Sequence, residues 1–335
     1  MRRSLLATSA LGLVLANAVW AGVTRHLSGN AADVNPALHG PALNLGGGST
    51  DVDAALQAMI DLARGCTGCA SSVDVVVLRA TGGDGYNEHI LALDGVDSVE
   101  TLVISSRSDA LGADVETTIR AAEVVFFAGG DQCNYVRNFR GTPVQAAVES
   151  VVERGGSVGG TSAGMAIQGE FVYDACSDSA RSVDILANPY HHSASFTPDF
   201  FRWPHMGGTL TDQHFVARDR MGRLLGFLAR HLQERQADHL LGVAADEQTS
   251  IVVDRSGKAT VYGNGGSTGT AYFVLADHVP GPGEVVRADT PLTYSDYRIW
   301  IRRAGESFDL GNRDRNGAAD RTVSVIGGVI QSDPW

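Results

Sequence analysis

The sequence of 335 residues predicts an α/β fold of three layers, αβα, with a mostly parallel sheet between two layers of helices. Two observations carry this prediction. Short apolar runs typical of buried parallel strands alternate along the chain with segments of helical periodicity. A turn of small residues, Gly160-Thr161-Ser162-Ala163-Gly164, follows an apolar run and precedes a helix-like segment. A strand, a sharp turn and a helix in this order are typical of a site at the carboxyl end of a sheet strand.

The first half of the chain carries the elements of this sheet. Residues 73–80 and 124–128 are near-continuous apolar runs, which indicates strands buried on both faces. After the turn at residues 46–48, Thr50 or Asp51 is expected to cap a helix. Strands are expected at residues 41–45, 73–80, 98–105, 124–128 and 157–159, and helices at residues 51–62, 115–122 and 143–153.

The second half of the chain is less regular. Residues 170–210 are rich in Ser, Asp, Pro and aromatic residues, and a loop of this length is often functional. A helix is expected to open at Thr211 and to run to about Leu232, with His214 near its start. Strands are expected at residues 240–245, 250–253, near 261 and at 271–275, with a turn at 263–269 and a mixed tail from 297. We interpret residues 22–335 as a single domain with a C-terminal extension from about residue 290.

The chain is acidic, with a formal net charge of -12 and an isoelectric point near 5.2. This charge disfavours nucleic acid or an anionic membrane surface as the main partner. Hydrophobic residues make up 44% of the chain, which is enough to build a large core. We therefore expect a globular protein whose main partner is not nucleic acid, and we expect no cofactor.

The N-terminus has the pattern of a secretory signal peptide. Met1-Arg2-Arg3 is basic, residues 5–19 are apolar, and Val19-Trp20-Ala21 offers a cleavage site before Gly22, with Ala16-Asn17-Ala18 as an alternative site. The apolar run is short for a membrane span. We predict a signal peptide at residues 1–21, export to the periplasm or the extracellular space, and no membrane span after its removal. An uncleaved membrane anchor is the alternative.

Four cysteines are consistent with an oxidising compartment. Cys66 and Cys69 are close enough in sequence for a local disulfide, which we favour over a redox or zinc pair because no second C-x-x-C motif is present. Cys133 and Cys176 are near the predicted site loops, and a disulfide between them is the second expectation.

Ser162 has the sequence context of a nucleophile at a G-x-S-x-G elbow. Glycines at 160 and 164 leave room for the sharp turn, and the following helix offers a free backbone N–H at Ala163. This N–H and that of Gly130 are the expected donors to an oxyanion. The alternative is a turn that only packs a helix on a strand, but the order of strand and helix favours the nucleophile.

A nucleophilic serine requires a general base and an orienting acid. His214 is the preferred base, because it follows Asp212-Gln213 and precedes three arginines in a stretch dense in polar groups. Glu247 is the preferred acid, because it directly follows a predicted strand. Asp246 is its rival, and Asp174 and Asp178 are more distant candidates. The alternative for Asp212 is a simple helix cap.

Four ordered motifs together resemble the cyanophycinase family of serine peptidases, over roughly residues 41–275. They are F-F-A-G-G-D-Q (126–132), G-G-T-S-A-G-M-A (159–166), T-D-Q-H-F-V-A-R-D-R-M-G-R (211–223) and G-V-A-A-D-E-Q-T (242–249). The resemblance implies a flavodoxin-like fold similar to that of class I glutamine amidotransferases. It also implies Ser162, His214 and Glu247 as the catalytic triad. The substrate pocket that it implies consists of Gln132, Asp212, Gln213, Arg218, Arg220 and Arg223.

The reaction implied by this resemblance is hydrolysis of cyanophycin, a poly-aspartate backbone that carries arginine side groups, to β-aspartyl-arginine. Acidic pocket residues would hold the guanidinium group, and arginines would hold carboxylates through bidentate bonds. Two features depart from the family pattern: the apolar Val136 after the G-G-D-Q motif, and the long segment 170–210. There are two alternatives: an aspartyl dipeptidase or isopeptidase of the same family, and a non-catalytic binding module. The sequence does not distinguish a monomer from a homodimer.

Two further patterns resemble metal sites only in part. His191, His192 and His205 lack a supporting carboxylate spacing, and adjacent histidines seldom converge on one ion. Residues 312–320 resemble the front of a calcium-binding loop, but Val323 occupies the position of the final acidic ligand. A polar turn is the preferred interpretation, and no metal is expected.

Overall fold

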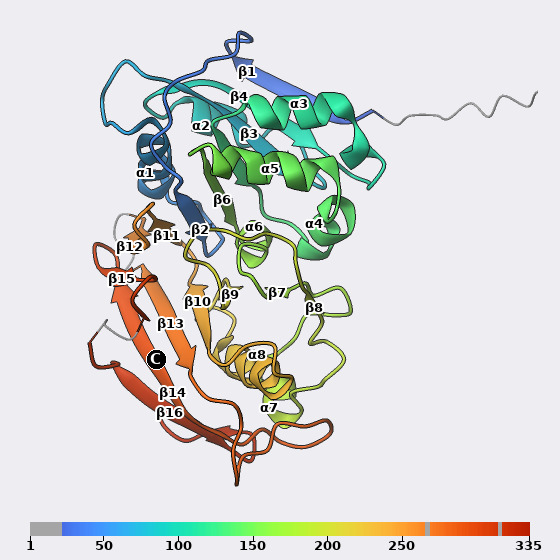
Figure 1. Cartoon of the computed structure of the whole chain (residues 1–335), viewed down its shortest axis with the longest axis vertical. Coiled ribbons are helices and arrows are strands. Elements are labelled where there is room, and N and C mark those ends of the chain that lie inside the picture. Colours follow the sequence, from blue (N-terminus) through green and yellow to red (C-terminus); the bar gives the residue numbers. More distant parts are fainter. Residues whose placement is uncertain (1–21, 265–268, 314–316) are drawn as a thin grey trace, which may run out of the picture.

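The computed structural model describes residues 22–264, 269–313 and 317–335. These residues form two large sheets, one above the other in Figure 1, and a small ribbon of β7 (Val172–Tyr173) and β8 (Phe196–Thr197). The expected signal peptide at residues 1–21 lies outside the described residues, as do parts of the expected turns at 263–269 and 312–320. Within the described part of the chain, no helix has the length and apolar character needed to cross a bilayer.

The upper sheet has the strand order β1-β4-β3-β5-β6-β2-β11-β12-β15. Its centre, from β4 to β2, is parallel, and the strands outside this block pair antiparallel. The central strands are buried apolar runs, which a parallel sheet covered on both faces requires. Its strands are β1 (Thr24–Gly29), β2 (Leu43–Gly46), β3 (Val73–Arg79), β4 (Val96–Val103), β5 (Val124–Phe127), β6 (Ser157–Thr161), β11 (Thr249–Val253), β12 (Lys258–Gly263) and β15 (Ser307–Asp309).

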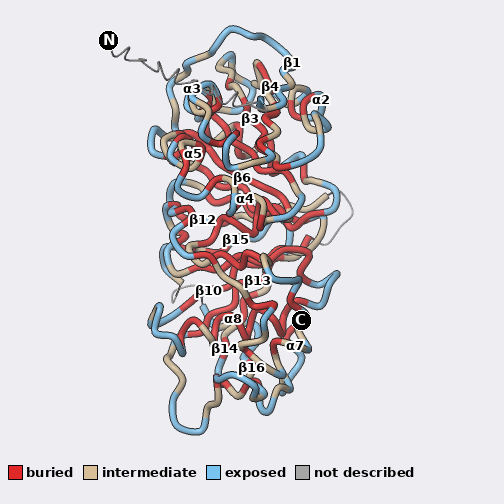
Figure 2. The backbone as a smooth tube through the Cα atoms, turned by 90° about the vertical axis from the view of Figure 1, so that its right-hand side faces the viewer, coloured by how far each residue is buried: buried red, intermediate tan, exposed pale blue. Residues whose placement is uncertain are grey.

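Helices cover both faces of the upper sheet, so the predicted three-layer α/β fold is confirmed (Figure 1). On one face, α1 (Asp53–Arg64) and α2 (Asn87–Leu91) bury Leu56, Met59 and Ile90 against β3 and β5. The other face packs against α3 (Ala113–Ala121), α4 (Gln132–Phe139) and α5 (Pro143–Glu153). A 3₁₀ turn, η1 (Asp109–Leu111), precedes α3. Figure 2 shows the buried strands running through the middle of the molecule, with exposed loops at the periphery.

The lower sheet was not expected as a separate sheet. Its order is β17-β16-β14-β13-β10-β9, and it packs against α7 (Ser182–Ala187) and α8 (Met221–Gln233). The segment from about residue 290, which was expected as a C-terminal extension of the domain, supplies strands to both sheets. The strands are β9 (Thr209–Asp212), β10 (Leu240–Ala245), β13 (Thr270–Ala276), β14 (Tyr294–Arg303), β16 (Arg321–Ile326) and β17 (Val329–Ile330).

Two local expectations were wrong, and some elements were not expected. The helix expected from Thr211 begins only at Met221, because Thr211 and Asp212 end β9, which pairs in parallel with β10. Neither Thr50 nor Asp51 caps α1: Val52 occupies the cap position, and the Asp51 carboxylate accepts a hydrogen bond from the Tyr86 hydroxyl at 2.8 Å. Strand β1 and helix α4 were not expected.

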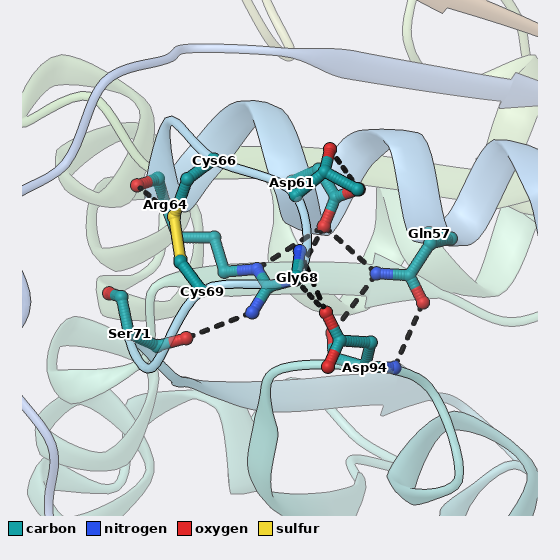
Figure 3. The surroundings of a disulfide bond; sticks show 9 residues. Gln57, Asp61, Arg64, Cys66, Gly68, Cys69, Ser71 and Asp94 are labelled. Atoms are coloured by element: carbon teal, nitrogen blue, oxygen red, sulfur yellow. Dashed lines mark hydrogen bonds and ion pairs between the residues drawn. A yellow bond between two sulfur atoms is a disulfide. The ribbon is translucent and has the colours of Figure 1, made fainter.

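Both expected disulfides are present. Cys66 and Cys69 close a short loop after α1, at the end of the helix where Arg64 binds Asp61 and Asp94 (Figure 3). Cys133 and Cys176 join the first turn of α4 to the segment between β7 and α7. The first disulfide is therefore local, whereas the second connects two elements 43 residues apart in the sequence.

Candidate active site

Ser162 lies on a sharp turn between β6 and the single-turn helix α6 (Ala163–Ala166). Its φ of 52° and ψ of −113° are strained for a residue with a side chain. The flanking glycines are required by contact: a Cβ on Gly160 would lie 2.6 Å from the backbone carbon of Gly164, and one on Gly164 would collide with the carbonyl oxygen of Phe127. The sequence therefore builds the nucleophile elbow that the G-x-S-x-G pattern indicates.

The structure brings Ser162, His214 and Glu247 into one hydrogen-bonded chain. The Ser162 Oγ lies 2.8 Å from Nε2 of His214, and the His214 Nδ1 lies 2.7 Å from Oε1 of Glu247. His214 follows β9 and Glu247 follows β10, and these strands are parallel neighbours, so their carboxyl ends meet at one edge. Ser162 follows β6 of the upper sheet, so the three groups meet where the two sheets adjoin. Serine, imidazole and carboxylate in this order can act as nucleophile, base and orienting acid.

The two candidate acids after β10 have different partners. Glu247 contacts the imidazole, whereas the Asp246 Oδ1 accepts hydrogen bonds from the backbone N–H groups of Val216 and Ala217, each at 3.0 Å. Asp246 thus holds the turn that follows His214. The geometry assigns the orienting position to Glu247 and places Asp174 and Asp178 elsewhere, in the segment between β7 and α7.

The glycine turn after β2 connects the three active-site segments. Consecutive carbonyls of Gly46, Gly47 and Gly48 accept hydrogen bonds from the N–H groups of Ser162 at 2.9 Å, His214 at 2.8 Å and Gln248 at 3.0 Å. Gln248 is the residue after Glu247. Glycine is needed here because a Cβ on Gly47 would collide with the Asp246 carbonyl. The sequence predicts this turn only as the lead-in to a helix, because no local pattern reports its contacts with the two other segments.

The environment of His214 favours the neutral imidazole. Burial lowers its pKa below the usual value, and the charges of Arg218 and Arg220 lower it further, while the hydrogen bond to Glu247 acts in the opposite direction. A neutral imidazole whose Nδ1 faces a carboxylate presents Nε2 to the serine as a proton acceptor. This is the state that a general base requires before the reaction begins.

The glycine turn after β5 faces the nucleophile. A Cβ on Gly129 would lie 3.6 Å from the Cβ of Ser162, so the Gly129-Gly130 backbone borders the site. The side chain of Asp131 caps α4 by accepting a hydrogen bond from the Cys133 N–H at 2.9 Å, and half-buried Gln132 begins the helix. The N–H groups of Gly130 and Ala163 stay the expected oxyanion donors.

The expected pocket residues of the 211–223 motif divide into two groups. Asp212 is 1% exposed and binds Arg223 through Nε at 2.8 Å and through Nη2, so this carboxylate is already paired. Arg220 donates to the Gln213 carbonyl at 2.7 Å and lies 3.7 Å from Asp212. Burial and the neighbouring Arg223 lower the pKa of Arg220 to about 10, which leaves it cationic at neutral pH. Arg218 is exposed.

The expected pocket residues therefore differ in how far they are exposed. The Asp212–Arg223 pair is buried and lies beside Arg220, which is itself only 7% exposed. Of the other expected pocket residues, Arg218 is exposed and Gln132 is half-buried. Gln213 is buried and contributes its carbonyl to Arg220. Tyr173, whose ring lies 5.0 Å from the Arg223 guanidinium, was missed, since its sequence context carries no such signal. Among the described residues, no three His, Cys, Asp or Glu side chains converge in a way that could hold a metal ion.

Comparison with known proteins agrees with this architecture. The model of peptidase family S51 matches residues 88–256. The chain is 31% identical over 221 residues to a cyanophycinase of a Nostoc species, covering 65% of this chain and 67% of the relative. It is 28% identical over 227 residues to a cyanophycinase of Synechococcus elongatus, covering 64% and 62% of the two chains.

A solved structure of a peptidase from an acI-B1 Actinobacterium has a similar fold. Its TM-score is 0.51 at 16% identity, and the match covers 81% of this chain and 98% of that one. This likeness supports the fold alone. The family match and the sequence matches show that the chain is a serine-type peptidase that belongs to peptidase family S51, the family of the cyanophycinases.

Proposed function

We propose that this peptidase is exported and that it hydrolyses cyanophycin to β-aspartyl-arginine dipeptides through an acyl-enzyme. The observation that carries the proposal is the serine–histidine–glutamate chain at 2.8 and 2.7 Å, with the cationic Arg220 held beside it. The relatives named cyanophycinase support the choice of substrate. An arginine that keeps its charge in a buried position suits a substrate carboxylate.

The reaction follows from the roles of the three side chains. The Ser162 Oγ attacks the carbonyl carbon of the scissile amide while Nε2 of His214 takes the hydroxyl proton. Glu247 holds the imidazole by Nδ1 and stabilises the imidazolium that forms. The N–H groups of Gly130 and Ala163 stabilise the oxyanion. The imidazolium then gives its proton to the leaving amine, and a water molecule, activated by the same imidazole, hydrolyses the ester on Ser162.

The substrate contacts in this proposal differ from the simple expectation. Arg218 and Arg220 bind the carboxylates of the substrate, and Gln132 binds a polar group on the other side of the serine. Asp212 does not serve as the partner of the substrate guanidinium, because Arg223 occupies both of its oxygens. The buried pair instead positions Arg220.

Export is the second part of the proposal. Two disulfides in a chain of this size are typical of an oxidising compartment, and the first 21 residues have the composition of a signal peptide. The mature protein should begin near Gly22, with Cys66 and Cys69 oxidised. Mass spectrometry of the protein recovered from outside the cytoplasm checks this, and an intact Met1 would contradict it.

A granule-clearing assay tests the substrate. Insoluble cyanophycin should be cleared by the wild-type protein with release of β-aspartyl-arginine, and Ser162→Ala should leave the granules intact. Cleavage of small aspartyl peptides without clearing would instead favour an aspartyl dipeptidase or isopeptidase. That second candidate rests on Val136, which is apolar, buried in α4 and departs from the pattern that the family resemblance implies.

A further inference from the structure

We propose that the Cys133–Cys176 disulfide positions the substrate pocket. It fixes the loop of residues 173–180, which contacts Arg223, relative to the turn at Gly129 beside Ser162. The disulfide then governs the affinity for a peptide substrate and leaves the reactivity of Ser162 unchanged. This inference rests on the proposed function in one respect: it requires a substrate that contacts Arg220.

The first half of the disulfide belongs to the nucleophile side of the site. Cys133 is 3% exposed and lies in the first turn of α4, directly after Gln132. Its backbone N–H binds the Asp131 carboxylate at 2.9 Å, which fixes the end of the turn that begins at Gly129. Since Gly129 packs against Ser162, the Cys133 sulfur is anchored to the same rigid unit as the nucleophile.

The second half belongs to a loop that is closed on itself. The N–H of Cys176 donates to Asp174 Oδ1 at 2.9 Å, and the same carboxylate accepts hydrogen bonds from Ser195 at 2.5 Å and Thr197 at 2.8 Å. The Tyr173 hydroxyl accepts from the Ala180 N–H at 2.7 Å and donates to the Asp178 carbonyl at 3.1 Å. Residues 173–180 therefore move as one unit with the Cys176 sulfur.

The loop of residues 173–180 contacts Arg223 of the buried Asp212–Arg223 pair directly. The Arg223 guanidinium lies over the Tyr173 ring at 5.0 Å and donates through Nη1 to the Ala180 carbonyl at 3.2 Å. Arg223 in turn holds Asp212, which lies 3.7 Å from Arg220. A continuous series of contacts thus connects the disulfide to Arg220, and the disulfide ties that series to the nucleophile side.

The two ends of the loop, Tyr173 and Ala180, are buried, but its tip has no apolar burial of its own. Ser177, Asp178 and Ser179 at its tip are exposed and small or polar. Without the disulfide, the loop would have more freedom, and binding a substrate would have to order it. That cost falls on substrate binding rather than on the serine, whose own contacts to His214 and Gly46 do not involve the loop.

The other disulfide offers a matched control. Cys66–Cys69 lies after α1, and the polar groups drawn around it in Figure 3 come from α1 and from residues 68–71 and 94. None of these residues bonds to the active-site groups described above. Removal of the Cys66–Cys69 disulfide also leaves the protein with one disulfide, but it changes no contact of the substrate pocket.

The test compares Cys133→Ser/Cys176→Ser with Cys66→Ser/Cys69→Ser. For the first variant we expect KM for an aspartyl-arginine peptide to rise by about tenfold, the effect of ordering one or two side chains on binding, with kcat within about twofold. Labelling of Ser162 by a small fluorophosphonate should proceed at the wild-type rate in both variants. The control variant should keep the wild-type KM.

Hydrogen exchange supplies a readout that needs no substrate. Amides of residues 173–182 and 218–223 should exchange faster in Cys133→Ser/Cys176→Ser than in the control variant. If the wild-type protein cleaves no aspartyl peptide, the proposed function fails while this comparison still decides the present inference. Unchanged KM, unchanged exchange in residues 218–223, equal effects in both variants, or loss of fluorophosphonate labelling would each overturn the positioning role.

Discussion

A Cβ atom on Gly48 would lie 2.5 Å from Nε2 of His214, so the turn after β2 leaves room for the catalytic imidazole only because residue 48 is a glycine. The φ of +101° at this position also suits glycine. Gly48→Ala should displace the ring from Ser162 and lower kcat by about 100-fold, as a misplacement of about 1 Å does. Steady-state kinetics on a cleavable peptide measures this loss.

Gly283→Ala is the matched control for backbone strain. Gly283 has a φ of +93°, and a Cβ there would meet no neighbour. If this control lost as much activity as Gly48→Ala, general strain rather than the displaced imidazole would explain the effect.

The choice between the two acids leads to the second prediction. Glu247→Gln should lower kcat by at least about 100-fold, because the amide no longer stabilises the imidazolium that forms when Ser162 attacks. Asp246→Asn should keep activity within about threefold, because its side-chain oxygen can still accept from Val216 and Ala217. Ser162→Ala and His214→Ala should each be at least as damaging as Glu247→Gln. A silent Glu247→Gln with an inactive Asp246→Asn would reverse the assignment.

The third prediction concerns the pH profile. The base must be neutral, so kcat/KM should rise with pH through the pKa of His214, which burial and nearby arginines keep below its usual value. Arg218→Gln removes a positive charge that lowers this pKa, so the acidic limb should move to higher pH. The midpoint from kcat/KM measured across pH 4 to 8 tests the shift. Arg287→Gln, at an exposed position on a distant loop, should leave the midpoint unchanged.

The fourth prediction separates the two buried arginines. Arg220→Ala should lower kcat/KM for a carboxylate-bearing peptide by about tenfold or more, because a charge-assisted bond contributes about 1.5–3 kcal/mol, and labelling of Ser162 should persist. Arg223→Ala removes the cation that binds both oxygens of the buried Asp212 and leaves it only the more distant Arg220 at 3.7 Å, so it should destabilise the fold by about 3–5 kcal/mol. Denaturant unfolding of both variants measures the difference. A stability loss only in Arg220→Ala would make Arg220 the structural brace.

The sequence predicts the upper sheet well because its central strands are continuous apolar runs, and the elbow because Gly160 and Gly164 have no substitute at their contacts. It misplaces the start of α8 because Thr211 and Asp212 are residue types typical of a helix start and precede the helical apolar spacing that begins at Met221. Those residues are a strand only by pairing with β10, which is a tertiary interaction that periodicity does not report.

The sequence predicts which residues belong to the active site better than it predicts which of them contact one another. Asp246 and Glu247 are consecutive acids after one strand, and only the backbone groups of Val216 and Ala217 distinguish their roles. The pairing of Asp212 with Arg223 depends on the turn between β9 and α8, whose path no local pattern specifies. The same holds for Tyr173, which reaches Arg223 from a separate segment.

The most direct test of the central claim is product analysis of purified cyanophycin after incubation with the wild-type protein and with Ser162→Ala. We expect clearing of the polymer by the wild-type protein, β-aspartyl-arginine as the released product, and neither with the variant. The mass of trapped wild-type enzyme should also increase by one acyl group on Ser162. Polymer left intact by a wild-type protein whose Ser162 reacts with a fluorophosphonate would contradict the claim.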